Sequence, residues 1–143
     1  MKTQHLLLID PIAFPGGSKI ATSHALALAD TQQLRVTVVT RDPASWSGQN
    51  LRTVKLFEPG FLASREQGLA YFLRHLIIFL NILLARVRYG RFDTAVGASG
   101  PGVDLSLYLG KSCLGYRVVQ LIHGPVARSR TIARALRAAD RVE

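Results

Sequence analysis

The sequence predicts an α/β fold with a mostly parallel sheet and helices on both of its faces. Short apolar or β-branched runs alternate along the chain with longer segments of helical periodicity, which is typical of strand–helix–strand units. Several of these runs end at glycine, proline or serine, as strands do before a loop. With 143 residues, 48% of them hydrophobic, the chain suits one domain with a substantial core.

The first half of the chain contains three predicted strands and one predicted helix. Residues 6–9 are all apolar and are followed by Asp10-Pro11, which ends the first strand. Ser18 is a candidate cap for a helix that runs to about Asp30. The β-branched run 35–40 is the second strand, and 51–57 alternates like a strand with one solvated face.

The second half begins with a long apolar segment, 65–89, which predicts a helix. Its polar residues recur every seven positions and form one narrow stripe, at Gln67, Arg74, Asn81 and Arg88. Residues 94–98 are the next strand, followed by a helix that ends near Leu114, before Gly115. A buried strand at 116–122, a helix at 128–139 and the start of one more strand at 140–143 complete the pattern.

Three loops of this order fall at the carboxyl edge of the predicted sheet: 11–18, 99–102 and 123–128. Ligands of parallel α/β sheets bind outside the carboxyl ends of the strands. The topology therefore predicts that these loops form the functional site.

The first loop leads into Gly16-Gly17-Ser18-Lys19. Two glycines let the backbone approach a ligand closely, the free amides at a helix start attract anions, and Lys19 adds a positive charge. A tight turn with an ordinary cap explains the same residues without a ligand. The dinucleotide fingerprint and the P-loop pattern are both absent, which argues against nicotinamide and ATP enzymes.

The other two loops supply further candidates. His123 ends a central strand, Gly124 leaves room beside it, and its neutral imidazole can donate and accept hydrogen bonds. Arg128 follows on the same loop. Ser99 and Gly100 precede a helix and could reach a substrate, although Ser99 as a helix cap explains that loop equally. The histidines show no zinc spacing and Cys113 is the single cysteine, so we expect no metal and no disulfide.

The charge pattern favours an anionic partner. Eighteen basic and nine acidic residues give a net charge of +9. No recognisable nucleic-acid-binding motif is present, so we expect no nucleic acid partner. The last helix presents arginines on one face, which solvent or an anionic surface could cover. The apolar flank of helix 65–89 is either buried or rests on lipid or a partner, and we expect burial. The charged residues within this helix argue against a membrane span.

The order of these motifs resembles the N-terminal domain of glycosyltransferase family four. The matching features are Leu-Leu-Leu-Ile-Asp-Pro, then Phe-Pro-Gly-Gly-Ser at 14–18, the strand 35–40, the strand that ends in His-Gly-Pro at 123–125, and the helix followed by Ala-Asp-Arg-Val. The resemblance implies a Rossmann-like domain, the acceptor-side half of a GT-B enzyme. The nucleotide-sugar-binding half would lie outside residues 1–143.

The resemblance also implies residue roles and partners. The glycine pair 16–17 would approach the donor diphosphate or the acceptor, and His123 would reach the transferred sugar. We expect retaining transfer from a nucleotide sugar, without a cofactor, to a glycan or lipid-linked acceptor in surface polysaccharide or lipopolysaccharide synthesis. We expect a cytoplasmic protein with peripheral contact to an anionic membrane. The alternative is a non-catalytic α/β binding module that uses a basic surface to hold a membrane or partner.

Overall fold

The computed structural model describes residues 3–28, 33–65 and 67–143. Its six strands form one parallel sheet in the order β3-β2-β1-β4-β5-β6. The chain therefore builds outward from β1 on one side and then returns to build on the other side. The mostly parallel α/β fold expected from the sequence is confirmed. The strands are β1 (Gln4–Asp10), β2 (Leu34–Thr40), β3 (Leu51–Lys55), β4 (Thr94–Gly97), β5 (Arg117–Gln120) and β6 (Arg141–Val142).

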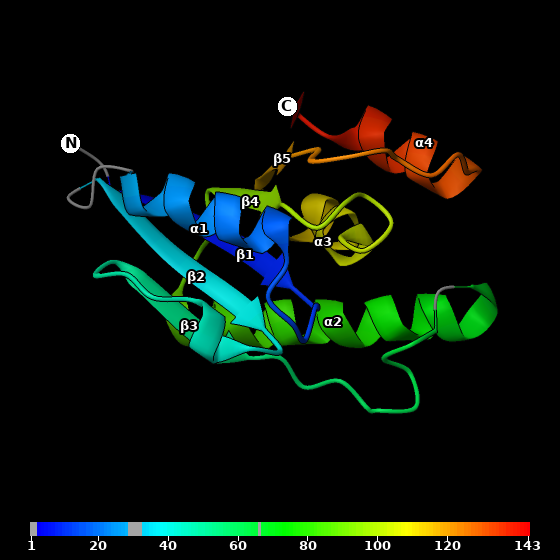
Figure 1. Cartoon of the computed structure of the whole chain (residues 1–143), viewed down its shortest axis with the longest axis horizontal. Coiled ribbons are helices and arrows are strands. Elements are labelled where there is room, and N and C mark those ends of the chain that lie inside the picture. The colour runs from blue at the N-terminus through cyan, green and yellow to red at the C-terminus, as the bar shows by residue number, and fades with distance from the viewer. Residues whose placement is uncertain (1–2, 29–32, 66) are drawn as a thin grey trace.

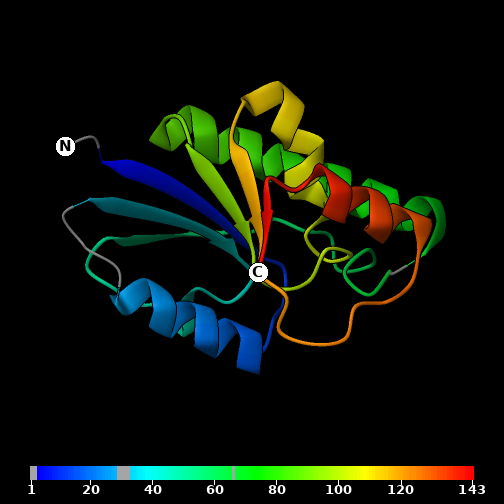
Figure 2. The ribbon, with the colours of Figure 1, turned by 90° about the horizontal axis from the view of Figure 1, so that it is seen from above.

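Helices cover both faces of the sheet, as predicted. Helix α1 (Gly17–Leu28) lies on one face, while α2 (Gly68–Tyr89) and α3 (Leu105–Leu114) lie on the other (Figures 1 and 2). Helix α4 (Arg130–Ala138) joins β5 to β6 and lies near α3. A single 3-10 turn, η1 (Pro43–Ser45), follows β2. The strand order reverses between β1 and β4, which is the topological switch point of the sheet. Open α/β sheets bind ligands at this point.

The strand residues alternate between two apolar clusters because successive side chains point to opposite faces. Leu7 and Ile9 of β1 pack with Ile78 and Ile82 of α2 on one face. Leu8 of β1 packs on the other face in a smaller cluster, whose members include Val36, Val38 and Trp46, with Leu26 of α1 against it. The larger cluster therefore fixes α2 and α3 to the sheet.

Several predicted boundaries need correction. Helix α1 begins at Gly17, so Ser18 lies inside the first turn and does not cap it; the predicted end at Asp30 lies outside the described residues. Helix α3 begins at Leu105 after a turn, so Ser99 does not cap that helix. Helix α4 is capped by Ser129, whose hydroxyl accepts a hydrogen bond from the Ile132 amide at 3.1 Å. The arginines of α4 are exposed, as expected for a solvated face.

Helix α2 is more exposed than the sequence led us to expect. Arg74 and Asn81, from its polar stripe, are buried, and much of its apolar flank is exposed. Asn81 explains the orientation, since its amide donates to the Phe57 carbonyl and accepts from the Phe57 amide, both at 2.9 Å. Arg74 forms an ion pair with buried Glu58. The polar stripe therefore holds the segment after β3, and the expectation of a buried apolar flank is wrong.

Candidate functional site

The three predicted loops meet in one hollow at the carboxyl edge of the sheet. The hollow has a volume of about 460 Å³ and lies at the ends of β1, β4 and β5. Ser18 contributes from the start of α1, residues 98–103 from the loop after β4, and residues 122–127 from the loop after β5. Their convergence follows from the parallel strand order, which puts these loops side by side at the switch point.

Five of the nine predicted site residues line this hollow: Ser18, Ser99, Gly100, His123 and Gly124. His123 is exposed, so its ring is accessible to a ligand. The other four, Gly16, Gly17, Lys19 and Arg128, are not among the lining residues. Gly16 and Gly17 directly precede Ser18, and Arg128 is an exposed residue that follows the third loop.

Three of the glycines have no structural reason to lack a side chain. An added Cβ at Gly17 or Gly124 would meet nothing within 4 Å, and one at Gly16 would meet only the Phe14 ring at 4.0 Å. None of the three has a positive φ. In contrast, Gly100 has a φ of 107°, which favours glycine by itself. The open space beside Gly17 and Gly124 leaves room for a ligand against the backbone.

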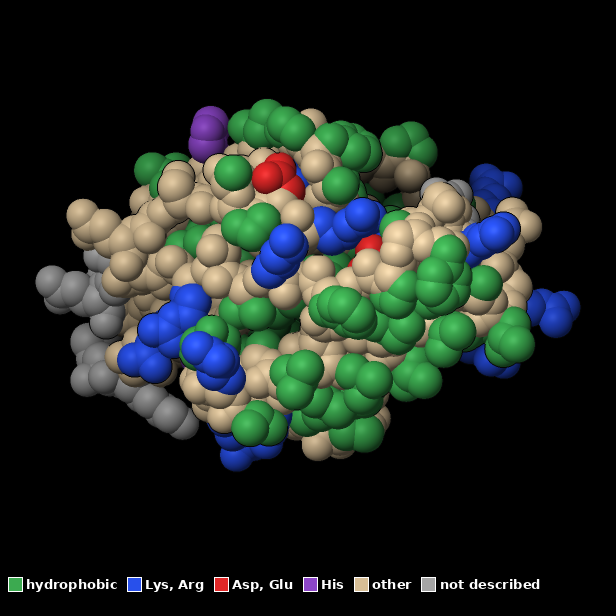
Figure 3. Space-filling model, turned by 90° about the horizontal axis from the view of Figure 1, so that it is seen from below, with side chains coloured by type: hydrophobic (Ala, Val, Ile, Leu, Met, Phe, Trp, Pro, Cys, Tyr) green, Lys and Arg blue, Asp and Glu red, His purple; other side chains and the backbone are tan. Residues whose placement is uncertain are grey.

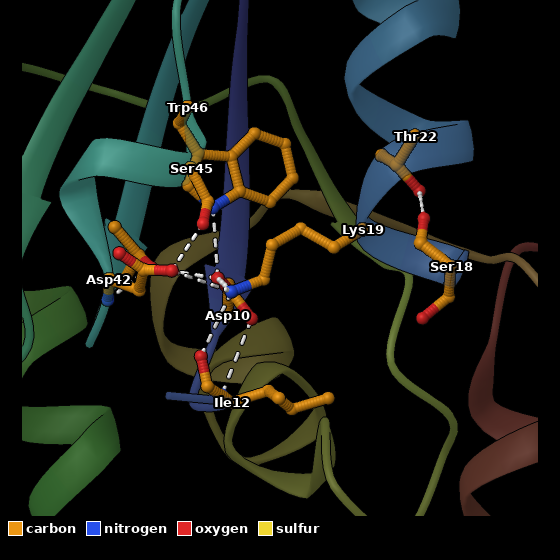
Figure 4. Close-up of polar contacts among 9 residues, drawn as sticks. Asp10, Ile12, Ser18, Lys19, Thr22, Asp42, Ser45 and Trp46 are labelled. Carbon is orange, nitrogen blue, oxygen red and sulfur yellow. Dashed lines mark hydrogen bonds and ion pairs between the residues drawn. The ribbon is translucent and has the colours of Figure 1, made fainter. Parts of the chain in front are cut away.

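Lys19 does not offer a free charge at the helix start (Figure 4). Its side chain is buried, and its ammonium lies 2.9 Å from Asp10 Oδ2 and 3.7 Å from Asp42 Oδ2. It also donates to the Ile12 carbonyl at 3.0 Å. These two carboxylates neutralise the charge that the sequence suggested for a ligand. Lys19 is thus a residue that fixes the loop after β1, and its expected role as a direct ligand needs this correction.

Asp10 is the centre of that buried polar cluster. Its Oδ2 accepts hydrogen bonds from the Thr40 hydroxyl at 2.7 Å and the Trp46 indole at 2.9 Å. The cluster joins the ends of β1 and β2 to the start of α1, so the glycine loop is held in place before any ligand arrives. Trp46 was not among the residues that the sequence singled out. A lone tryptophan soon after a predicted strand was the available signal, because a buried indole N–H needs a partner.

A second buried cluster supports the loop after β4. Asp104 Oδ2 accepts from the Ser99 amide at 3.1 Å and from Gln120 Nε2 at 3.2 Å. The Tyr108 hydroxyl donates to Gln120 Oε1 at 2.8 Å. Complete burial raises the pKa of Asp104 to about 7. An added Cβ at Gly97 would lie 2.8 Å from Asp104 Oδ2, so this glycine is required by packing.

A second hollow continues from the first toward α2. It has a volume of about 540 Å³ and shares Gly102, Val103, Ala127 and Ile132 with the first. Tyr71 and Phe72 line its other side, and the Tyr71 hydroxyl donates to the Gly102 carbonyl at 2.6 Å. The two hollows therefore form adjoining spaces that lead from His123 to the first turns of α2.

Within the described part of the chain, no group of three or more His, Cys, Asp or Glu side chains could hold a metal ion. Cys113, the single cysteine, is exposed on α3.

Comparison with known proteins reveals similarity to solved structures. No protein-family model matches the sequence, and no curated protein sequence matches it. The chain is similar to the crystal structure of a ugt transferase from Siraitia grosvenorii in complex with UDP, with a TM-score of 0.51 and 14% identity. The likeness covers 83% of this chain and 24% of that chain, so this chain spans about a quarter of its neighbour's length. The fold is accordingly a Rossmann-like α/β fold of the kind found in a glycosyltransferase.

Proposed function

We propose that this chain is the acceptor-side domain of a retaining glycosyltransferase that resembles family four. The enzyme would transfer a sugar from a nucleotide-sugar donor to a glycan or lipid-linked acceptor, in the synthesis of surface polysaccharide or lipopolysaccharide. The observation that carries the proposal is the hollow in which Ser18, Ser99 and His123 converge at the switch point of the sheet. Binding of UDP by the structural neighbour is consistent with a nucleotide-sugar donor.

In the proposed reaction, the bond between the anomeric carbon and the donor diphosphate breaks, and its electron pair leaves with the diphosphate. The acceptor hydroxyl oxygen forms the new bond on the same face, and its proton passes to the departing diphosphate. Backbone amides at the start of α1, beside Gly17, would stabilise the charge that develops on the diphosphate. His123 would hydrogen-bond the transferred sugar and orient it. No step needs a metal.

The alternative is a non-catalytic α/β binding module. The exposed apolar flank of α2 favours this alternative, because a large apolar surface on a soluble domain marks an interaction site. The two functions differ in whether the hollow supports a reaction. A binding module would release no nucleoside diphosphate from a nucleotide sugar, with or without a substitution at His123.

The test is turnover of nucleotide sugars by the protein that carries this chain, measured as release of the nucleoside diphosphate with glycan and lipid-linked acceptors. His123→Ala should lower kcat about a hundredfold, the usual cost of removing one oriented hydrogen-bonding group. Because His123 is exposed, the free energy of unfolding should change by less than about 1 kcal/mol. Unchanged turnover in a variant with normal stability would remove His123 from the site.

The glycines provide a second arm of the test. Gly17→Val and Gly124→Val add side chains where the protein leaves open space, so both should fold while raising the KM for the donor or acceptor. Gly60→Val is the matched control, since its Cβ also meets open space but Gly60, unlike Gly17 and Gly124, neither lines the hollow nor directly adjoins a residue that lines it. Equal kinetics for all three variants would show that the glycine loops do not approach a ligand.

A further inference from the structure

Helix α2 turns its most apolar side toward solvent. Leu69 is 85% exposed and Val87 is 86% exposed, and between them Leu73, Leu76, Leu80 and Leu84 are 45% to 69% exposed. Figure 3 shows hydrophobic side chains gathered on the side of the molecule that carries α2. We define the outer face of α2 by its exposed hydrophobic residues: Leu69, Phe72, Leu73, Leu76, Leu80, Leu84 and Val87.

These residues form a continuous stripe along the whole helix. Their spacing of three and four positions keeps them on one side of α2 over its 22 residues. Phe57, which is 73% exposed, lies next to α2, because its backbone is hydrogen-bonded to Asn81. A contiguous apolar surface of this extent marks an interaction site on a soluble domain.

The charges near this face are basic. Residues 67–92 contain four arginines and no aspartate or glutamate. Arg88 and Arg91 are exposed at the C-terminal end of α2, and Arg65 is exposed just before its N-terminal end. The whole chain carries a net charge of +9. An apolar face with basic residues at both of its ends complements a surface that is negatively charged outside and apolar beneath.

We propose that the outer face of α2 docks in the plane of an anionic lipid bilayer. The length and composition of α2 would also allow it to cross a membrane. Its inner face, however, packs on the sheet through Ile78 and Ile82 and binds the Phe57 backbone through Asn81. These contacts keep the helix on the domain, so only its outer face is free to enter the bilayer interface.

The charge also favours lipid over a second copy of the chain. Two copies joined through this face would bring net charges of +9 together, and residues 67–92 offer no acidic group to pair with the arginines. An anionic bilayer instead attracts both the arginines and the apolar stripe. Phe72 belongs to the outer face and also lines the second hollow, so docking brings the mouth of that hollow to the membrane surface. The docking inference stands independently of glycosyl transfer.

The test is co-sedimentation of the chain with phosphatidylcholine vesicles, with and without phosphatidylglycerol. We expect binding that requires phosphatidylglycerol and weakens with added salt, because exposed charges are screened. Leu84→Ser with Val87→Ser should lower the partition coefficient about a hundredfold, since two apolar side chains lose their burial in the interface. The matched control is Ile20→Ser with Leu28→Ser on α1, on the opposite face of the sheet, which should bind like the unchanged chain.

An independent variant tests the charge. Arg88→Gln should reduce binding about fivefold, and only on vesicles that contain phosphatidylglycerol. Circular dichroism of each variant checks that the fold is intact. Absence of binding to the anionic vesicles, or equal binding by the Leu84/Val87 variant, would overturn the inference. A lipid-free dimer in sedimentation velocity that the same double substitution abolishes would assign the face to a second copy instead.

Discussion

The buried ion pair between Lys19 and Asp10 gives the sharpest prediction about the loop after β1. Both side chains are almost inaccessible, with 4% and 2% of their side-chain surfaces exposed. Lys19→Met keeps most of the side-chain volume but leaves the Asp10 carboxylate buried without its cation. Removing one member of a buried pair typically costs 3–5 kcal/mol. Asp10 retains the donors of Thr40 and Trp46, so we expect the lower end, about 3 kcal/mol.

The assay is urea unfolding at neutral pH, in which this loss appears as a lower midpoint at an unchanged slope. Lys111→Met is the matched control, because Lys111 also lies 2.9 Å from a carboxylate, that of Asp140, but both side chains are about one-third exposed. An exposed pair of this kind contributes at most about 1 kcal/mol. A loss below about 1 kcal/mol for Lys19→Met would refute our account, as would equal losses for the two variants.

Three further predictions concern the interior. Gly17→Ala should leave the free energy of unfolding within about 0.5 kcal/mol of that of the unchanged chain. Gly97→Ala should cost at least about 2 kcal/mol, because its Cβ would press on the Asp104 carboxylate. Urea unfolding of the two variants measures the difference. Burial raises the pKa of Asp104 to about 7, so the contribution of Asp104 to stability should fall as pH rises from about 4 to 7, and Asp104→Asn should remove that contribution. Burial lowers the pKa of His75 to about 4, so the contribution of His75 should change in the opposite direction, falling as pH drops from 6.5 toward 4, and His75→Phe should remove it. Because the two contributions oppose each other, each is measured as the difference between the pH profile of the variant and that of the unchanged chain.

The direction of each pH dependence follows from whether the folded or the unfolded state binds the proton. Between pH 4 and 7 the folded state holds the Asp104 proton that the unfolded state releases, so raising the pH favours unfolding. Below pH 6.5 the unfolded state binds a proton at His75 that the folded state refuses, so lowering the pH favours unfolding. Thermal unfolding across this range measures both. Unaltered pH profiles in the two variants would contradict these assignments, and equal stability of the Gly17 and Gly97 variants would contradict the packing argument.

The sheet and its site edge could be predicted from the sequence because they depend on local patterns. Short apolar runs identify buried strands, and parallel order places every strand-to-helix loop at the same edge. The strand order alone therefore places the loops that contain Ser18, Ser99 and His123 at one edge of the sheet. Their convergence in one hollow confirms the topological reasoning.

Apart from the helix caps at Ser18 and Ser99, the failures involve partners distant in sequence. Lys19 seemed free because its neutralising partners, Asp10 and Asp42, lie nine and twenty-three positions away along the chain. The apolar flank of α2 was expected to be buried because periodicity cannot reveal that Asn81 pairs with the backbone of Phe57. The role of Trp46 was missed because its indole meets Asp10 only after β2 returns beside β1. Periodicity defines the faces of an element but not which face the rest of the chain covers.

The most direct test of the proposed site is a titration of the isotope-labelled protein that carries this chain, first with a nucleotide-sugar donor and then with glycan acceptors, followed by backbone amide chemical shifts. Our account predicts that the largest shifts cluster at Ser18, Ser99, Gly100 and Gly124, around the hollow. Gly124→Val should suppress them while the remaining spectrum stays the same. Shifts that cluster elsewhere in the chain, or a spectrum left unchanged by the donor and the acceptors alike, would contradict the assignment of this edge of the sheet as the site of glycosyl transfer.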